Sequence, residues 1–133
     1  MPPEKPLLYT KEFLRHEKEL PPEVQSVVRS LLLEVLAVEG MSLASGTLLK
    51  ALGSGLWEFR IGRNLKSVLK AAGITLPHNA RNRKVLVRVF CSFEDGGILL
   101  LGCYDKLRNG SDRAQNIAIQ NARSMLLTFR GGK

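Results

Sequence analysis

The sequence predicts an α+β domain, because apolar residues recur with helical spacing toward both ends of the chain and alternate with polar residues in the middle. The chain has 133 residues, 44% of them hydrophobic, which suits one buried core. No apolar run approaches the roughly 20 residues of a membrane helix, and the first residues lack the apolar stretch of a signal peptide. We therefore expect one domain over residues 1–133, in the cytoplasm and without a membrane partner.

The N-terminal part of the chain predicts a helical hairpin packed on a sheet. Thr10 can cap a first helix that runs to Leu20, and Pro22 and Glu23 suit the first turn of a second helix that ends at Gly40. Apolar residues of the second helix are spaced three and four apart, at Val24, Val27, Val28, Leu31, Leu32, Val35 and Leu36.

The middle of the chain predicts a small antiparallel sheet of three strands. Residues 85–93 and 98–104 form a hairpin around a turn at residues 94–97, where glycines can adopt positive φ angles. Residues 98–101 are apolar on both faces, which indicates a covered strand. The remaining strand covers residues 56–61.

Alternation in residues 56–61 separates two faces of the first predicted strand. Trp57, Phe59 and Ile61 are expected to face the core, and Trp57 is interpreted as a core residue more readily than as a base-stacking one. Glu58 and Arg60 then point to the other face.

A C-terminal helix is predicted after the break at Asn109 and Gly110. Ser111 or Asp112 can cap it, and it runs to about Phe129. Its apolar side is expected to comprise Ile117, Ala118, Ala122, Met125 and Leu126.

The positive charge of the chain is concentrated in one segment. The net charge is +8, from 20 Lys and Arg against 12 Asp and Glu. Residues 59–93 contain no acidic side chain and eight basic ones: Arg60, Arg63, Lys66, Lys70, Arg81, Arg83, Lys84 and Arg88. Such segregation is typical of proteins that bind polyanions, with nucleic acid the leading partner class and an acidic protein the second. A basic surface kept for solubility is the alternative interpretation.

Part of this basic segment connects the first two strands. Residues 62–84 are longer than an ordinary strand connection. Residues 64–72 have helical spacing, and residues 76–83 form a polar loop that contains His78. The two cysteines, Cys91 and Cys103, lack a metal-ligand spacing, so we expect reduced core residues and no metal or cofactor.

The candidate chemistry is cationic. Arg60 and Arg88 project from the non-core face of neighbouring predicted strands, and Lys106 follows the third, so the three could converge on one phosphate. A metal-free ribonuclease needs such groups, because attack of a 2′-hydroxyl on phosphorus builds negative charge on the phosphoryl oxygens. It also needs a proton acceptor and a proton donor. The candidates for these two roles are Tyr104, Lys106, His78 and Glu58.

Each of these residues also has an ordinary structural interpretation. Arg60 beside Glu58 can be a solvated ion pair, and Arg88 can pair with Glu58 across strands for sheet stability alone. Lys106 can belong to a turn, Tyr104 can close the core with its hydroxyl in water, and His78 can be an exposed loop residue.

Two stretches of the sequence resemble a known family of toxins. Residues 49–60 read Leu-Lys-Ala-Leu-Gly-Ser-Gly-Leu-Trp-Glu-Phe-Arg, and residues 88–106 combine a strand arginine, an Asp-Gly-Gly turn, an apolar strand and a trailing lysine. Together they resemble the RelE/ParE toxin superfamily, in particular its HigB-like, phage-derived branch. The resemblance spans about residues 8–128.

This resemblance implies the toxin of a type II toxin-antitoxin module, with a RelE-like fold. Such a toxin cleaves mRNA at the ribosome without a metal and is held inactive by a cognate antitoxin protein. Arg60, Arg88 and Lys106 match basic positions of the family, and with Tyr104 they form the expected catalytic set. The insertion at 62–84 is expected to bind RNA, the ribosome or the antitoxin through Arg63, Lys66, Lys70, Arg81, Arg83 and Lys84.

Two other functions remain open at this point. The family's frequent C-terminal Tyr or His has no counterpart after Tyr104, which is compatible with a binding protein without catalysis, either a gyrase poison or a toxin-like nucleic-acid-binding regulator. A DNA-binding module is weakened by the absence of helix-turn-helix spacing. The final helix still carries polar residues that could contact DNA, at Arg113, Gln115, Asn116, Gln120, Asn121 and Arg123.

Overall fold

The computed structural model describes residues 5–62, 65–71, 73–75 and 85–131. Its α+β fold is built on a five-stranded sheet in the order β1-β5-β4-β3-β2. The strands are β1 (Leu7–Tyr9), β2 (Leu49–Gly53), β3 (Leu56–Ile61), β4 (Val87–Glu94) and β5 (Gly97–Asp105). Strand β1 runs parallel to β5, whereas the other neighbours are antiparallel, so the sheet is mixed and not purely antiparallel as predicted.

The helical segments lie between and after these strands. They are α1 (Lys11–Lys18), α2 (Pro22–Leu31), a π-helical turn η1 (Leu32–Leu36), α3 (Ala37–Glu39), a 3₁₀ helix η2 (Gly40–Ser45), α4 (Leu65–Ala71) and α5 (Asp112–Phe129). In the described part of the chain, no helix is long and apolar enough to cross a membrane.

Local sequence signals define the helix ends as predicted. The Thr10 hydroxyl accepts a hydrogen bond from the Phe13 amide at 3.1 Å, and Ser111 accepts one from Ala114 at 3.1 Å. Pro22 occupies the first turn of α2. Gly40 ends α3 with a φ of +54°, a conformation that favours glycine.

The two strands that the sequence did not predict lie at the edges of the sheet. Strand β1 has only three residues, and its partner β5 lies about 90 residues further along the chain. Strand β2 buries few of its side chains, and its pairing with β3 is interrupted by a bulge between Ala51 and Gly53. Both strands therefore lack the alternation that marks a half-buried strand.

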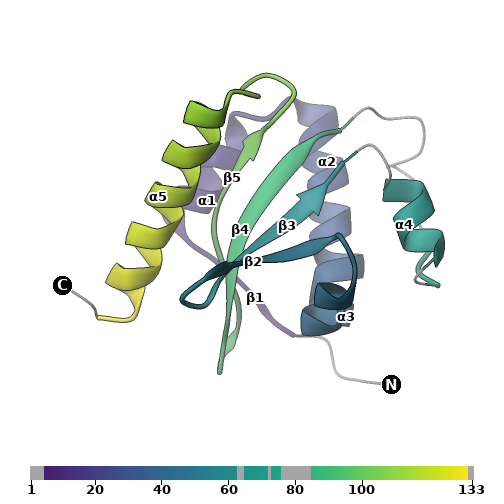
Figure 1. Cartoon of the computed structure of the whole chain (residues 1–133), viewed down its shortest axis with the longest axis horizontal. Helices are drawn as coiled ribbons and strands as arrows, with labels where there is room; N and C mark the ends of the chain where they lie inside the picture. The colour runs from purple at the N-terminus through teal and green to yellow at the C-terminus, as the bar shows by residue number, and fades with distance from the viewer. Residues whose placement is uncertain (1–4, 63–64, 72, 76–84, 132–133) are drawn as a thin grey trace.

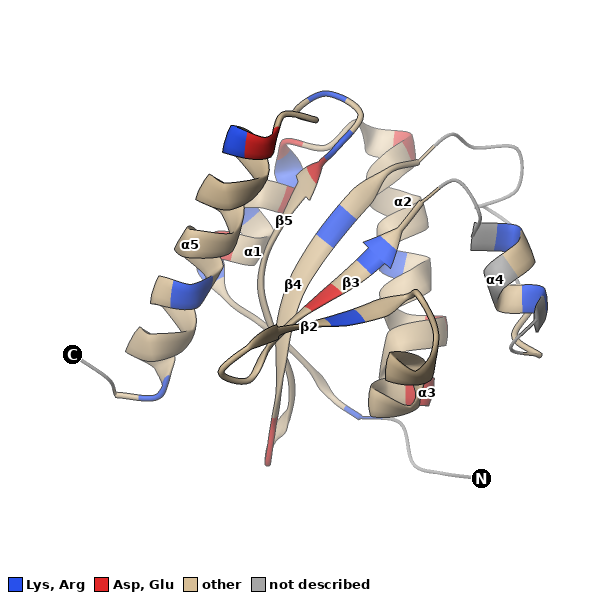
Figure 2. Ribbon diagram, viewed as in Figure 1, with Lys and Arg blue, Asp and Glu red and all other residues tan. Residues whose placement is uncertain are grey.

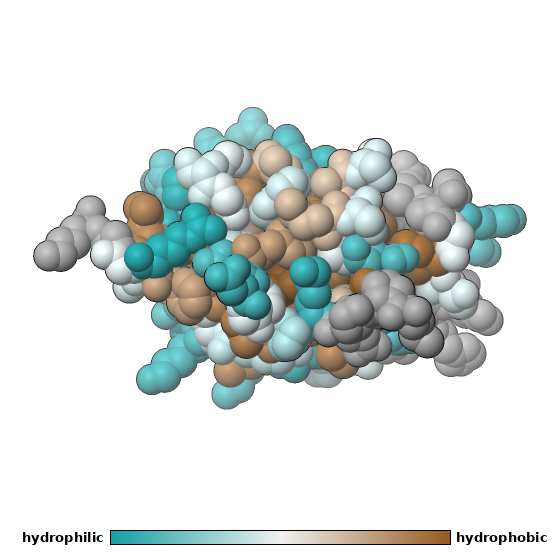
Figure 3. All heavy atoms as spheres, turned by 90° about the horizontal axis from the view of Figure 1, so that it is seen from below, coloured by the Kyte–Doolittle hydropathy of each residue, from teal (hydrophilic) through white to brown (hydrophobic). Residues whose placement is uncertain are grey.

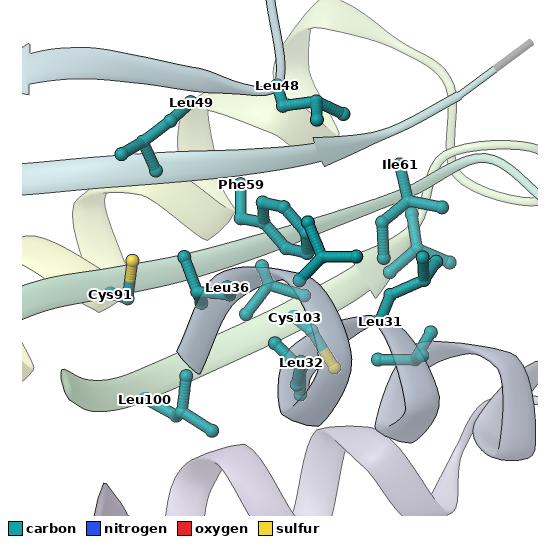
Figure 4. Close-up of a cluster of buried hydrophobic side chains, with 14 of the residues drawn as sticks. Leu31, Leu32, Leu36, Leu48, Leu49, Phe59, Ile61, Cys91, Leu100 and Cys103 are labelled. Atoms are coloured by element: carbon teal, nitrogen blue, oxygen red, sulfur yellow. The ribbon is translucent and has the colours of Figure 1, made fainter. Parts of the chain in front are cut away.

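Helices cover both sides of the sheet (Figure 1). Helices α1 and α2 lie behind it in this view, and α5 lies at the left beside β5, nearer the viewer. The side of α1 and α2 holds the larger cluster of buried side chains, which we call the main core (Figure 4). It joins residues of α2 and η1, such as Leu31, Leu32 and Leu36, to Phe59 and Ile61 of β3.

The two cysteines belong to the main core. Cys91 of β4 and Cys103 of β5 are free thiols. Burial raises the pKa of each thiol to about 12, so both stay protonated at neutral pH.

A smaller cluster lies under α5 and is here called the α5 cluster. It consists of Leu56, Phe90, Leu99, Leu101, Ala122 and Leu126. Ile117 was predicted on the buried side of the helix, but it is 48% exposed. The Ile117 prediction is wrong, whereas Ala122 and Leu126 are buried as predicted.

Hydrophilic side chains border the apolar ones on the surface seen from below (Figure 3). The large apolar side chains that remain exposed are dispersed over several elements of the described structure: Leu14, Leu33, Met41, Leu107, Ile117, Leu127 and Phe129.

Candidate active site

The polar side chains of β3 point to the side of the sheet that carries α5. Phe59 and Ile61 are fully buried in the main core, and Trp57 packs against it in an edge-to-face contact with Phe93 at 6.0 Å. Because side chains alternate along a strand, Glu58 and Arg60 face the opposite way, as predicted. The interpretation of Trp57 as a core residue is confirmed.

Strand register brings the predicted arginines and the tyrosine into one row. Arg60 of β3 is the Cα partner of Arg88 of β4, and Arg88 is the partner of Tyr104 of β5. Glu58 lies one pleat away, opposite Phe90. In Figure 2, basic positions (blue) lie side by side on β4 and β3, and an acidic position (red) lies next to the basic one on β3.

A bulge in β5 sets which face Tyr104 occupies. Phe90 pairs with Gly102 but Cys91 pairs with Leu100, so β5 contains one extra residue, Leu101, at this point. Without the bulge, strict alternation along β5 would place Tyr104 on the main-core face with Leu100. The bulge moves Tyr104 to the Arg88 side and Cys103 into the main core. Bulges are frequent next to active sites for this reason.

The Glu58 carboxylate forms ion pairs with both arginines. The Glu58 Oε1 atom lies 3.4 Å from the Arg60 Nε atom and 3.9 Å from the Arg88 Nε atom. Glu58 is only 1% exposed, so the interpretation of Glu58 and Arg60 as a solvated surface pair is wrong. A buried carboxylate beside two guanidinium groups keeps its charge compensated.

Hydrogen bonds to backbone carbonyl groups of β3 and β4 hold the Arg88 guanidinium in place. Its Nη1 atom donates hydrogen bonds to the carbonyl oxygens of Ile61 at 3.2 Å and Val87 at 3.4 Å. Burial, and then the positive charge of Arg60, lower the pKa of Arg88, while the Glu58 charge opposes this shift. The group nevertheless remains a cation at neutral pH.

Tyr104 contributes a hydroxyl to the same place. Its ring stacks on Phe90, with centroids 6.0 Å apart and planes inclined by 11°. Burial, and then the charge of Glu58, raise the pKa of the hydroxyl, against the opposing effect of Arg88. Tyr104 is therefore protonated at neutral pH and can donate a proton.

Three polar atoms of this cluster have no hydrogen-bond partner within the described structure. They are Glu58 Oε2, Arg88 Nε and the Tyr104 hydroxyl, and all three are buried. Folded proteins leave few such groups, because each one costs about 1–3 kcal/mol. Together these unpaired groups suit a polar ligand that accepts hydrogen bonds from the Arg88 guanidinium and the Tyr104 hydroxyl. We refer to Glu58, Arg60, Arg88 and Tyr104 as the polar cluster.

The other predicted site residues lie after β5, on α4 or outside the described residues. Lys106 follows β5, is half-buried, and its backbone amide donates to Leu86 at 2.7 Å. Lys66 and Lys70 are exposed on α4, whose Leu69 belongs to the main core on the other side of the sheet. Predicted residues outside the described part are Arg63, His78, Arg81, Arg83 and Lys84.

One basic residue on the same face was missed by the sequence analysis. Lys50 of β2 is exposed and is the Cα partner of Glu58. Its position depends on β2 being a strand, which the weak alternation of residues 49–53 did not indicate. A signal existed in the turn at residues 53–55, which connects two antiparallel strands through glycines with positive φ.

Comparison with known proteins adds no relative. No family model matches the chain, and a search of curated proteins finds no significant match.

Within the described residues, no three His, Cys, Asp or Glu side chains are grouped as a metal site would require.

Proposed function

We propose that this chain is the toxin of a type II toxin-antitoxin module, a RelE/HigB-type endoribonuclease that cleaves mRNA at the ribosome and acts in the cytoplasm. The observation that carries the proposal is the polar cluster, in which two arginines and a tyrosine occupy one row around a buried carboxylate. The order of two N-terminal helices, a sheet and a C-terminal helix supports the RelE-like fold within the same proposal.

The proposed reaction is an internal transfer at one phosphate of RNA. The ribose 2′-oxygen forms a bond to phosphorus while the bond from phosphorus to the 5′-oxygen breaks. The products are a 2′,3′-cyclic phosphate and a 5′-hydroxyl end, and no water or cofactor is consumed. Negative charge grows on the non-bridging oxygens, where Arg88 and Arg60 can donate hydrogen bonds.

The remaining two groups of the polar cluster can move protons. The free Glu58 Oε2 atom can accept the proton of the 2′-hydroxyl, and the protonated Tyr104 hydroxyl can give one to the leaving 5′-oxygen. Both atoms lack a partner in the described structure, and bound RNA could pair each one, because its 2′-hydroxyl donates to Glu58 Oε2 and its 5′-oxygen accepts from the Tyr104 hydroxyl.

Other cations extend the proposed RNA contacts. Lys106 follows Tyr104 by two residues and is the third cation of the catalytic set. Arg63, Lys66, Lys70, Arg81, Arg83 and Lys84 are proposed to bind RNA, the ribosome or the antitoxin. An antitoxin with acidic groups opposite Arg60 and Arg88 would neutralise these residues and block RNA at once.

Tyr104→Phe provides the sharpest test of this proposal. The substitution removes one hydroxyl that has no partner and keeps the ring on Phe90, so the fold is expected to keep its stability within about 0.5 kcal/mol. Loss of a proton donor is expected to slow cleavage by about 10²–10⁴-fold. We would express the protein in bacteria, follow growth, and map new 5′ ends of mRNA.

The matched control is Tyr9→Phe, the only other tyrosine of the chain, which lies on β1 beneath Arg29. New mRNA ends with wild type and Tyr9→Phe but not with Tyr104→Phe are the expected result. Growth arrest without new ends in the wild type would contradict RNA cleavage and favour a bound target such as gyrase. No arrest at all would favour a toxin-like nucleic-acid-binding regulator.

A further inference from the structure

The face that holds the polar cluster continues onto β2. Lys50 is directly opposite Glu58 in the antiparallel register of β2 and β3, so its side chain leaves the sheet on the same side. In Figure 2, a basic position (blue) on β2 lies beside the acidic position (red) on β3. The Arg60 amide donates to the Leu48 carbonyl at 2.7 Å, which fixes Lys50 and Arg60 as diagonal neighbours, with Cα atoms about 7–8 Å apart.

The cations on this face become more accessible from β4 to β2. The Arg88 side chain is 8% exposed and that of Arg60 is 36% exposed, while Lys50 is an exposed residue. An extended polyanion that reaches Arg88 from the side of β2 would therefore meet Lys50 first, then Arg60.

Lys50 is not needed to neutralise the buried carboxylate. Glu58 Oε1 already lies within 4 Å of both arginine Nε atoms, and no ion pair of the described residues includes Lys50. Arg60 faces Glu58 through its Nε atom, which leaves two Nη atoms, so that one can donate to the phosphate at Arg88 and the other to a second phosphate. Two cations one pleat apart can hold a phosphate that is distinct from the one at Arg88.

From this arrangement we infer that Lys50 and the outer end of Arg60 form a second phosphate subsite, which binds the nucleotide next to the scissile one in single-stranded RNA. The inference rests on the proposed function, because it assumes that the reacting phosphate binds at Arg88 of the polar cluster. Lys50 is a binding residue in this arrangement and takes no part in proton transfer.

The test measures the salt dependence of RNA binding. The full chain is titrated with a short single-stranded RNA in which every 2′-hydroxyl is methylated, so that the 2′-oxygen cannot attack. Lys50→Gln is expected to reduce the slope of log K against log salt concentration by about 0.7, the value for one lost phosphate contact on a single strand. That change makes the loss of affinity between 50 and 200 mM salt about 2.6-fold smaller than in the wild type.

Two variants serve as matched controls. Lys18→Gln removes an exposed lysine from α1 and is expected to leave the slope unchanged. Lys50→Arg is expected to restore the slope. In a cleavage assay on ribosomes loaded with mRNA, Lys50→Gln is expected to raise the concentration of loaded ribosomes at half-maximal rate and to leave the rate at saturation unchanged, whereas Tyr104→Phe lowers that rate.

Each outcome distinguishes this subsite from the proposed function. A reduced slope in a protein that does not cleave mRNA on ribosomes would support a phosphate contact at Lys50 and contradict the ribonuclease. Cleavage with an unchanged slope in Lys50→Gln would overturn the subsite alone and leave Lys50 as a lysine that keeps a sheet edge from pairing with other chains. If Lys50→Gln weakens binding of a poly-glutamate peptide while RNA binding is unchanged, the occupant is an acidic protein and the inference is also overturned.

Discussion

The two faces of the sheet use the same strand alternation for different purposes. On the side of α1 and α2, Phe59, Ile61 and Val89 are fully buried among apolar side chains of the main core. On the side of α5, the alternate positions Glu58 and Arg88 are almost as buried, yet they are charged and leave polar atoms unpaired. The first face stabilises the fold, and the second holds charged groups in fixed positions that a ligand can use.

The largest expected difference between the faces is in stability. Phe59→Ala removes a fully buried ring from the main core and should lower the free energy of unfolding by about 3–5 kcal/mol. Its neighbour Arg60 is more exposed, and Glu58 keeps Arg88 as a partner when Arg60 is lost. Arg60→Ala leaves the buried Glu58 carboxylate with one cation instead of two and should therefore cost about 1–3 kcal/mol, less than Phe59→Ala. Denaturant unfolding of both variants checks this prediction.

The two variants Phe59→Ala and Arg60→Ala should rank in the opposite order when the rate of RNA cleavage is measured. A purified Phe59→Ala protein that is still folded should keep its cleavage rate, whereas Arg60→Ala should lose most of it. Equal destabilisation by the two variants would show that the faces do not differ as described.

A smaller effect is expected from the attachment of α5. The Arg123 side chain donates to the carbonyl oxygens of Leu52 at 2.9 Å and Gly53 at 3.1 Å. Because these bonds join the helix to the end of β2, Arg123→Leu should lower the free energy of unfolding by about 1–3 kcal/mol. Arg108→Leu, at an exposed position before α5, is the control and should change it by less than about 0.5 kcal/mol. A similar loss in both variants would contradict a specific role for Arg123.

Sequence patterns identified the helices and strands in which buried and exposed side chains alternate regularly. The strands at residues 56–61, 85–93 and 98–104 and the capped helices were predicted because apolar periodicity and capping residues act locally. Strand β1 is held by pairing with β5, which depends on residues about 90 positions away. Strand β2 is an edge strand, where one buried face is not required. Neither is encoded by local alternation.

The candidate site was predictable in its residue types but not in its geometry. Alternation correctly placed Arg60 and Arg88 on the non-core face of neighbouring strands. The position of Tyr104 depends on the bulge at Leu101, which shifts the register by one residue and is not visible as periodicity. Gly102 was the available hint, because glycine within a strand often marks a bulge.

The smallest predicted effect concerns His16, which connects α1 to the strand that carries Tyr104. The His16 Nδ1 atom accepts a hydrogen bond from the Cys103 amide at 3.3 Å, so this atom is unprotonated in the native state. Burial, and then the positive charge of Arg15, lower the pKa of His16, against the smaller opposing effects of Glu19 and Glu12. The unfolded chain therefore binds more protons than the folded one as the pH falls through the ordinary histidine range near 6.5.

Stability should thus be full above this range and decrease as the pH falls toward the lowered pKa, by about 1 kcal/mol, the contribution of one hydrogen bond. Chemical denaturation between pH 5.5 and 7.5 measures the change, and His16→Gln should remove it. His78→Gln, the variant of the only other histidine, should leave it in place. If the pH dependence persists in His16→Gln, the link between α1 and β5 does not depend on a neutral imidazole, and Tyr104 is held by the bulge and the Phe90 stack alone.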